Sequence, residues 1–169
     1  MNIRRLRFIL ESCALTQQNL DKVKEIEDIA YPNFMKGMQD IESISDVLDY
    51  AECDGEIICL IEDDWYILGC NSRKSIEIVD LASKKSLTFS DINKIVNFLK
   101  SYGDKVINVD ARATTSYRLI KLLQKRGAIE IIHDSPWNWE SETMHELKFK
   151  FITPSNFKEW LNLSEILNK

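Results

Sequence analysis

The sequence predicts a single α/β (α+β) domain, in which helices flank a mixed, mostly antiparallel central sheet of about seven strands. A length of 169 residues suits one domain with one hydrophobic core. Hydrophobic residues make up 44% and charged residues 29%, which is ordinary for a globular protein. Some short segments alternate apolar and polar residues, which predicts strands, and others repeat apolar residues at helical spacing, which predicts helices. Polar turns separate the two kinds of segment.

The first half of the chain predicts a strand, two helices and a three-stranded meander. Residues 3–14 alternate as a strand does, and Thr16 is placed to N-cap the helix that follows. That helix must end near Tyr31, because the residue before Pro32 avoids helical geometry. A second helix is expected over residues 41–51. Polar pairs typical of hairpin turns then separate the three meander strands, residues 56–61, 65–70 and 75–82.

The second half alternates helices with strands. Thr88 and Asp91 have the spacing of a capping box, and Thr114 or Thr115 is expected to cap a later helix that ends at Gly127. The predicted strands are residues 105–110, 128–133 and 143–152, and residues 136–139 are predicted to form a loop. We expect one domain over residues 1–152, with residues 153–169 as its C-terminal helical extension.

Charge and cysteine usage exclude several classes of protein. A net charge of -5 argues against nucleic acid as the main partner, since phosphate binding needs a basic surface. No apolar run approaches the ~20 residues that cross a bilayer, and no signal-peptide core follows the N-terminus, so a cytoplasmic protein is expected. With two histidines, a zinc site is not expected either. Reduced thiols are predicted for the four cysteines, none of which form a C-x-x-C pair: Cys13, Cys53, Cys59 and Cys70.

Three short segments and the order of elements carry a family resemblance. The segments are Ile29-Ala30-Tyr31-Pro32, the strand 76–81, and residues 116–128 with Lys125-Arg126-Gly127 near their end. Together with the order of strands and helices, they resemble the GNAT superfamily. This resemblance implies an acyl-CoA-dependent N-acyltransferase that uses acetyl-CoA. Its acceptor would be an amine of unknown identity, on a small molecule or a protein.

The resemblance also implies where acyl-CoA would bind. In the family, the backbone of the fourth strand pairs with the pantetheine arm, and the matching residues here are Val79 and Leu81. The pyrophosphate sits on a glycine-rich loop at the N-terminus of the next helix. The equivalent residues 83–90 contain no glycine. Two interpretations stay open, a solvated turn with a helix cap or a charged phosphate site made by Lys84, Lys85, Ser86 and Thr88.

Further candidate residues follow the strand at 105–110. Ser116 falls where the family often has an asparagine that binds pantetheine, although a buried or capping serine is the alternative. An acyl transfer to an amine needs a base, and the carboxylates closest to the expected cofactor gap are Glu77, Asp80 and Asp110. Asp110 or Glu77 is the candidate for the base. The alternative for Asp110 is a structural ion pair with Arg112.

His133, Trp137 and Trp139 are the candidates for acceptor binding. In the family, the loop between the last two strands often shapes the acceptor site, and tryptophan faces bind cations well. The alternative is that the indoles cover one end of the core. Two functions therefore remain open, an N-acyltransferase and a catalytically inactive binding protein with the same fold.

Overall fold

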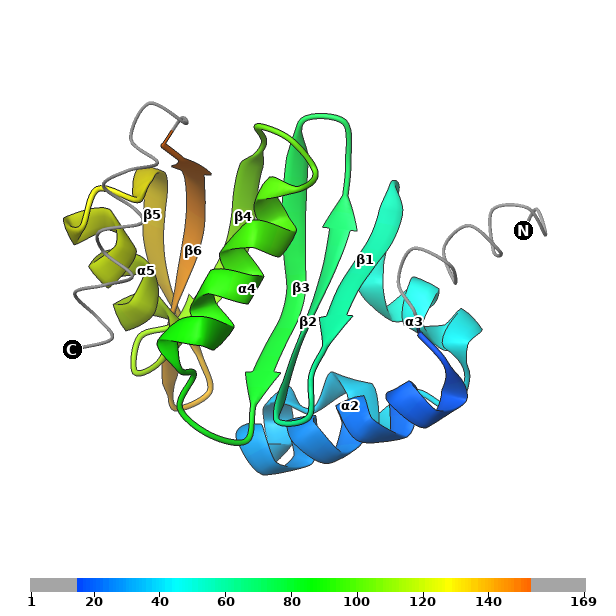
Figure 1. The fold of residues 1–169 in the computed structure, drawn as a ribbon. Helices are drawn as coiled ribbons and strands as arrows, with labels where there is room; N and C mark the ends of the chain where they lie inside the picture. The colour runs from blue at the N-terminus through cyan, green and yellow to red at the C-terminus, as the bar shows by residue number, and fades with distance from the viewer. Residues whose placement is uncertain (1–14, 153–169) are drawn as a thin grey trace. The chain divides into compact units, whose positions relative to one another are not determined.

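The computed structural model describes residues 15–152, so the predicted strand at 3–14 and the C-terminal extension lie outside the described residues. The described part is mixed α/β, with six strands in one mostly antiparallel sheet of order β1-β2-β3-β4-β6-β5 (Figure 1). The predicted order of elements within this range is confirmed. Among residues 15–152, no helix is both long enough and apolar enough to cross a bilayer.

The chain divides into two compact units. The first contains the residues up to Arg73 together with Glu77–Thr88, and the second contains Lys74–Ile76 and the residues from Phe89 onward. The strand β3 (Ser75–Ser83) therefore gives its first two residues to the second unit and the rest to the first.

In the first unit, the helix α2 (Gln17–Ala30) begins and ends as predicted. The Thr16 hydroxyl accepts a hydrogen bond from the Asn19 amide at 3.2 Å, which satisfies one of the donors left open at a helix start. Tyr31 is extended, as expected for a residue before proline. The buried side of the helix is apolar except for one carboxylate, and it consists of Leu20, Val23, Ile26 and Glu27.

The second helix is shorter than predicted. Two 3-10 turns, η1 (Asn33–Met35) and η2 (Gly37–Asp40), follow α2, and the helix α3 (Ile44–Ala51) begins three residues after Ile41. The reason is a capping box, in which the Ser43 amide donates to the Asp46 carboxylate at 2.9 Å. The apolar Ile41 is buried without being helical. Hydrophobic spacing alone placed the start of the helix too early.

The predicted meander is confirmed almost to the residue. The strand β1 is Glu56–Ile61, β2 is Trp65–Asn71 and β3 is Ser75–Ser83. β1 and β2 pair in antiparallel fashion, with Glu56 opposite Asn71 and Ile61 opposite Tyr66. β2 is buried along most of its length, which makes it the central strand of the core of this unit.

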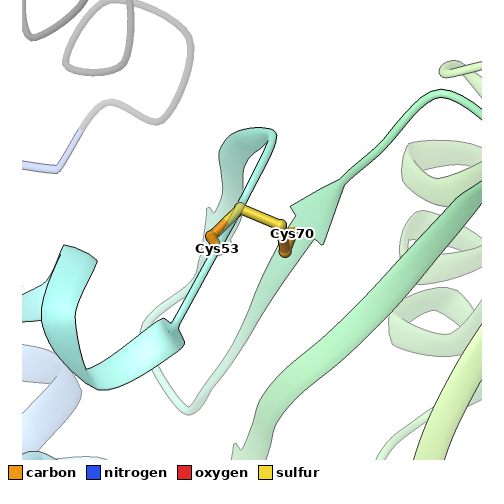
Figure 2. Close-up of a disulfide and its surroundings, with 2 residues drawn as sticks. All are labelled: Cys53 and Cys70. Atoms are coloured by element: carbon orange, nitrogen blue, oxygen red, sulfur yellow. A yellow bond between two sulfur atoms is a disulfide. The ribbon is translucent and has the colours of Figure 1, made fainter.

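The expectation of reduced thiols is wrong. Cys53, after α3, and Cys70, at the end of β2, form a disulfide with a Cα–Cα distance of 5.5 Å (Figure 2). Cys59 is disulfide-bonded as well. The two cysteines are 17 residues apart in sequence, and the β1–β2 hairpin is what brings Cys70 back beside the α3–β1 connection. Cysteine spacing in the sequence does not contain that information.

The second unit contains the remaining elements. The helix α4 is Phe89–Lys100, the strand β4 is Val106–Arg112, the helix α5 is Ser116–Lys125, and the strands β5 and β6 are Ile129–Trp139 and Glu142–Phe151. Both β4 and β5 pair with β6 in antiparallel fashion. Helix α5 lies against β4 and β5, and Figure 1 shows it on one side of β5.

One prediction about this unit is wrong. Residues 136–139 are not a loop, because they form the second half of β5 and pair with Glu142–His145 of β6. Pro136 suggested a loop, but β5 is the terminal strand of the sheet, and an edge strand tolerates proline. Thr115 occupies the N-cap position of α5, as predicted, but its side chain makes no capping hydrogen bond. Instead, the Ser116 hydroxyl accepts the Arg112 amide at 3.1 Å and holds the strand-to-helix turn.

Candidate functional site

The three strands of the second unit have two different faces. Residues directly opposite one another in a ladder point to the same face, and neighbours along a strand point to opposite faces. One face carries apolar residues under α5, including Ile107, Ala111 and Leu147. On the other, which we call the tryptophan face, the register places Asp110, His133, Trp137, Trp139 and Glu146.

Asp110 and Trp137 are in direct contact on the tryptophan face. The Trp137 indole nitrogen donates to the Asp110 carboxylate at 3.2 Å, joining β5 to β4 across β6. The pKa of Asp110 is raised above its ordinary value, first by partial burial and then by the negative charge of Glu146, which lies opposite it in the β4–β6 ladder. The Trp137 hydrogen bond opposes this rise. A carboxylate in such a state is a better proton acceptor than an isolated aspartate.

The two indoles offer an open aromatic surface. Trp137 and Trp139 are 39% and 37% exposed, and their rings lie nearly parallel with centroids 6.1 Å apart. Two positions along one strand is the spacing that puts both rings on the same face. An exposed aromatic face beside a carboxylate is a favourable surface for a cation.

His133 and Glu146 complete this face. The His133 Nε2 atom lies 3.2 Å from the Glu146 carboxylate. Farther along, the Arg112 guanidinium donates to Glu142 at 2.9 Å. Arg112 therefore pairs with Glu142, and the predicted alternative of an ion pair between Asp110 and Arg112 is not what the structure shows.

Four of the predicted candidates are thus brought together: Asp110, His133, Trp137 and Trp139. Sequence reasoning missed Glu146. The sequence signal for Glu146 was the alternation of polar and apolar residues along this strand, which puts Glu146 on the face opposite to Leu147. The pairing of Glu146 with Asp110 follows from the strand register. The roles of all five residues remain predictions.

The remaining candidates lie in the first unit, apart from Ser116. Glu77 is exposed on β3. The Leu81 carbonyl, which the family resemblance assigns to the pantetheine arm, accepts a hydrogen bond from the Tyr31 hydroxyl. The Ser116 hydroxyl accepts a hydrogen bond from the Arg112 amide. This contact corresponds to a structural serine, the alternative to binding pantetheine.

The loop predicted to hold a pyrophosphate is engaged within the first unit. The Lys84 ammonium lies 3.0 Å from Glu25 and the Lys85 ammonium 3.6 Å from Asp64. The Lys84 amide donates to the Asp64 carbonyl at 2.8 Å, and the Lys85 amide donates to the Ser83 hydroxyl at 3.3 Å. A phosphate-binding loop offers unpaired amides and cations, so a pyrophosphate bound here would have to replace these two amide hydrogen bonds and both ion pairs.

A second polar cluster, also missed from the sequence, lies beneath the start of α5. Asp134 accepts from the Tyr117 hydroxyl and contacts the His145 Nδ1 atom, both at 2.7 Å. The Tyr117 and His145 rings stack with centroids 3.6 Å apart. Burial would raise the pKa of Asp134, but the two hydrogen bonds outweigh burial and lower it. Both carboxylate oxygens are occupied, so this cluster fixes α5 to the strands.

Comparisons with known proteins add little. No protein-family model matches the chain, and no curated protein sequence matches it. A solved structure from Bacteroides thetaiotaomicron, provisionally described as a GNAT-family acetyltransferase, aligns with 90% of this chain and 93% of its own. Sequence identity is 12% and the TM-score 0.47. A likeness this weak assigns neither a family nor an activity to the chain.

Proposed function

We propose that the chain is an acyl-CoA-dependent N-acyltransferase whose amine acceptor, on a small molecule or a protein, binds at the tryptophan face. One observation carries this proposal. A carboxylate with a raised pKa, Asp110, is held by an indole N–H on an open face with two stacked indoles. The indoles would attract the alkylammonium form through their π-faces, and Glu146 would add a second negative charge.

Asp110 is the proposed base. An ammonium ion must lose a proton before its nitrogen can attack an acyl group, and the raised pKa of Asp110 suits it to accept that proton. The Trp137 N–H would hold the carboxylate in place during this step. Acetyl-CoA would supply the acyl group when bound, and its pyrophosphate would have to displace the ion pairs of Lys84 and Lys85.

The occupied loop favours a second candidate function. If the ion pairs of Lys84 and Lys85 persist in solution, the chain would bind an amine without transferring an acyl group. This would be a binding protein that uses the same tryptophan face. The two functions share the acceptor and differ in the cofactor.

A thermal-shift titration separates them. A ligand that binds only the native state at one hundred times its Kd stabilises it by about 2.7 kcal/mol, so millimolar acetyl-CoA reports even weak binding. Stabilisation by acetyl-CoA supports the enzyme. Stabilisation by n-butylammonium but not by acetyl-CoA supports the binding protein.

Activity provides the second test. Acetyl-CoA and a panel of primary amines are incubated with the protein, and release of the CoA thiol is followed. Replacing a general base is expected to cost on the order of a hundredfold in rate, so Asp110→Asn should lose most of the activity. Glu130→Gln, an exposed carboxylate on the same strand β5, is the matched control. Equal rates for Asp110→Asn and the wild type would contradict the proposed base.

A further inference from the structure

Two carboxylic acids meet in the core of the first unit. Glu27 is 0% exposed on the inner side of α2, and Asp80 is 8% exposed on β3. The two carboxyl groups lie close enough in this core for each to shift the pKa of the other. Two carboxyl groups can share a hydrogen bond only if one of them carries a proton, because two carboxylates offer acceptors and no donor.

Hydrogen bonds to this pair come from η2 and β2. From η2, the Met38 amide lies 3.0 Å from both oxygens of Glu27, and the Gln39 amide group donates to Glu27 at 3.3 Å. From β2, the Tyr66 hydroxyl donates to Asp80.

The charged and titratable neighbours are therefore tyrosines. Tyr66 and Tyr50, which lies on α3, have pKa values raised far above the ordinary value, mainly by burial and then by the charges of the two carboxylic acids. They stay neutral across the physiological range. No lysine, arginine or histidine is among the groups that act on the pair in the described residues. Within residues 15–152, the pair therefore has no cation to compensate a second negative charge.

We propose that Glu27 and Asp80 share one proton in the folded protein, and that its release to solvent loosens the contact of α2 and η2 with β3. The first unit would then contain a pH-responsive element. With the proton present, one negative charge is distributed over the Met38 amide, the Gln39 amide and the Tyr66 hydroxyl. Without it, two carboxylates repel each other in a desolvated core. The segment held by this pair includes Met38, which is 1% exposed.

The direction of the pH dependence follows from proton linkage. Burial, the largest cause, raises the pKa of Asp80 from 3.8 to about 7 and also raises the pKa of Glu27. The folded state therefore keeps a proton that the unfolded chain releases. The stabilisation is fully present below pH 3.8 and is lost as the pH rises through about 7.

Amide hydrogen exchange at Met38 measures this loss directly, because its N–H donates to Glu27. Exchange is recorded from pH 5 to pH 9 and corrected for the intrinsic pH dependence of exchange. The opening constant of this amide should rise about tenfold per pH unit towards pH 7 and then level off. The Leu147 amide in the second unit serves as the internal reference.

Variants decide the source of the effect. Asp80→Asn should remove most of the pH dependence, because an asparagine amide can donate to Glu27 without a titrating proton. Asp21→Asn, on the exposed side of α2, changes the net charge equally and should leave the wild-type profile intact. If Asp80→Asn does not fold, Glu27→Gln tests the same pair. The infrared C=O band of a buried protonated carboxylic acid, present in the wild type at pH 6 and absent at pH 9, provides a measurement without mutation.

Two results would overturn the proposal. One is a flat Met38 opening constant from pH 5 to pH 9. The other is an Asp80→Asn profile that matches the wild type. Neither result depends on acyl transfer or on amine binding.

Discussion

The two units each place an aspartate beside a glutamate, with opposite consequences. Glu27 and Asp80 are buried and shift each other's pKa, whereas Asp110 and Glu146 lie opposite one another on an open strand pair. Burial raises the pKa of both aspartates, but only the open pair can meet a ligand. The same chemistry thus acts as a structural contact in one unit and as a candidate site in the other. Solvent access makes the difference, more than the residue types do.

Truncating one glutamate of each pair should give the largest difference. Glu27→Ala leaves the Met38 amide and Asp80 without their partner in the core, and should lower the free energy of unfolding by about 3 kcal/mol. Glu146→Ala, on the exposed pair, should change it by no more than about 0.5 kcal/mol. Urea denaturation at pH 6 measures both. Similar losses for the two variants would remove the distinction between the pairs.

The Cys53–Cys70 disulfide should contribute nearly as much to the first unit. A bond that closes a loop of this length restricts the unfolded chain by about 3 kcal/mol, according to chain-entropy estimates. Cys53→Ala combined with Cys70→Ala, compared with the wild type under oxidising conditions, isolates this bond from the one at Cys59. A loss below about 1 kcal/mol would show that it adds little. Cell fractionation with thiol labelling would test the predicted cytoplasmic location, since stable disulfides are rare in that compartment.

Two tyrosine variants compare a buried with a more exposed hydrogen bond, and the expected losses of unfolding free energy are smaller. Tyr66→Phe removes a donor from the buried Asp80 and should cost about 2 kcal/mol, because a buried acceptor loses its partner. Tyr117→Phe removes a donor from the more exposed Asp134 and should cost less than about 1 kcal/mol. Chemical denaturation measures both, and the opposite ranking would contradict this view of burial.

The smallest expected effect is a shift in one titration. The Trp137 hydrogen bond lowers the pKa of Asp110, so Trp137→Phe should raise that pKa further. A carboxyl-detected NMR titration of Asp110 measures the change, and Trp139→Phe is the control that leaves the hydrogen bond in place. An unchanged or lower pKa in Trp137→Phe would mean that the indole does not act on Asp110.

Local chemistry explains which parts of the fold could be predicted from the sequence. The strands at 56–61, 65–71 and 75–83 are bounded by turn residues next to them in sequence, and Thr16 and Pro32 define α2 within one helical turn. The missed features depend on distant partners. Cys53 meets Cys70 only through the hairpin, and residues 136–139 become a strand because β6 supplies their pairing partners.

The candidate site shows the same division. Asp110, His133, Trp137 and Trp139 could be selected by residue type and by their positions near strand ends. The contacts of Trp137 with Asp110 and of Glu146 with His133 depend on the register of three strands. The engagement of Lys84 by Glu25 joins residues 59 positions apart, and no local pattern indicates it.

The irregularity between Ile131 and His133 makes the tryptophan face sensitive to insertions and deletions. Ile131 is opposite Phe149 and His133 is opposite Lys148, so β5 has one residue more than β6 at this point. Deleting the exposed Ile132 would restore a regular ladder and leave both indoles where they are. Deleting Ser135 instead would turn Trp137 and Trp139 towards the side covered by α5. Changes in chain length within this strand should therefore be tolerated before His133 and should abolish the site after it.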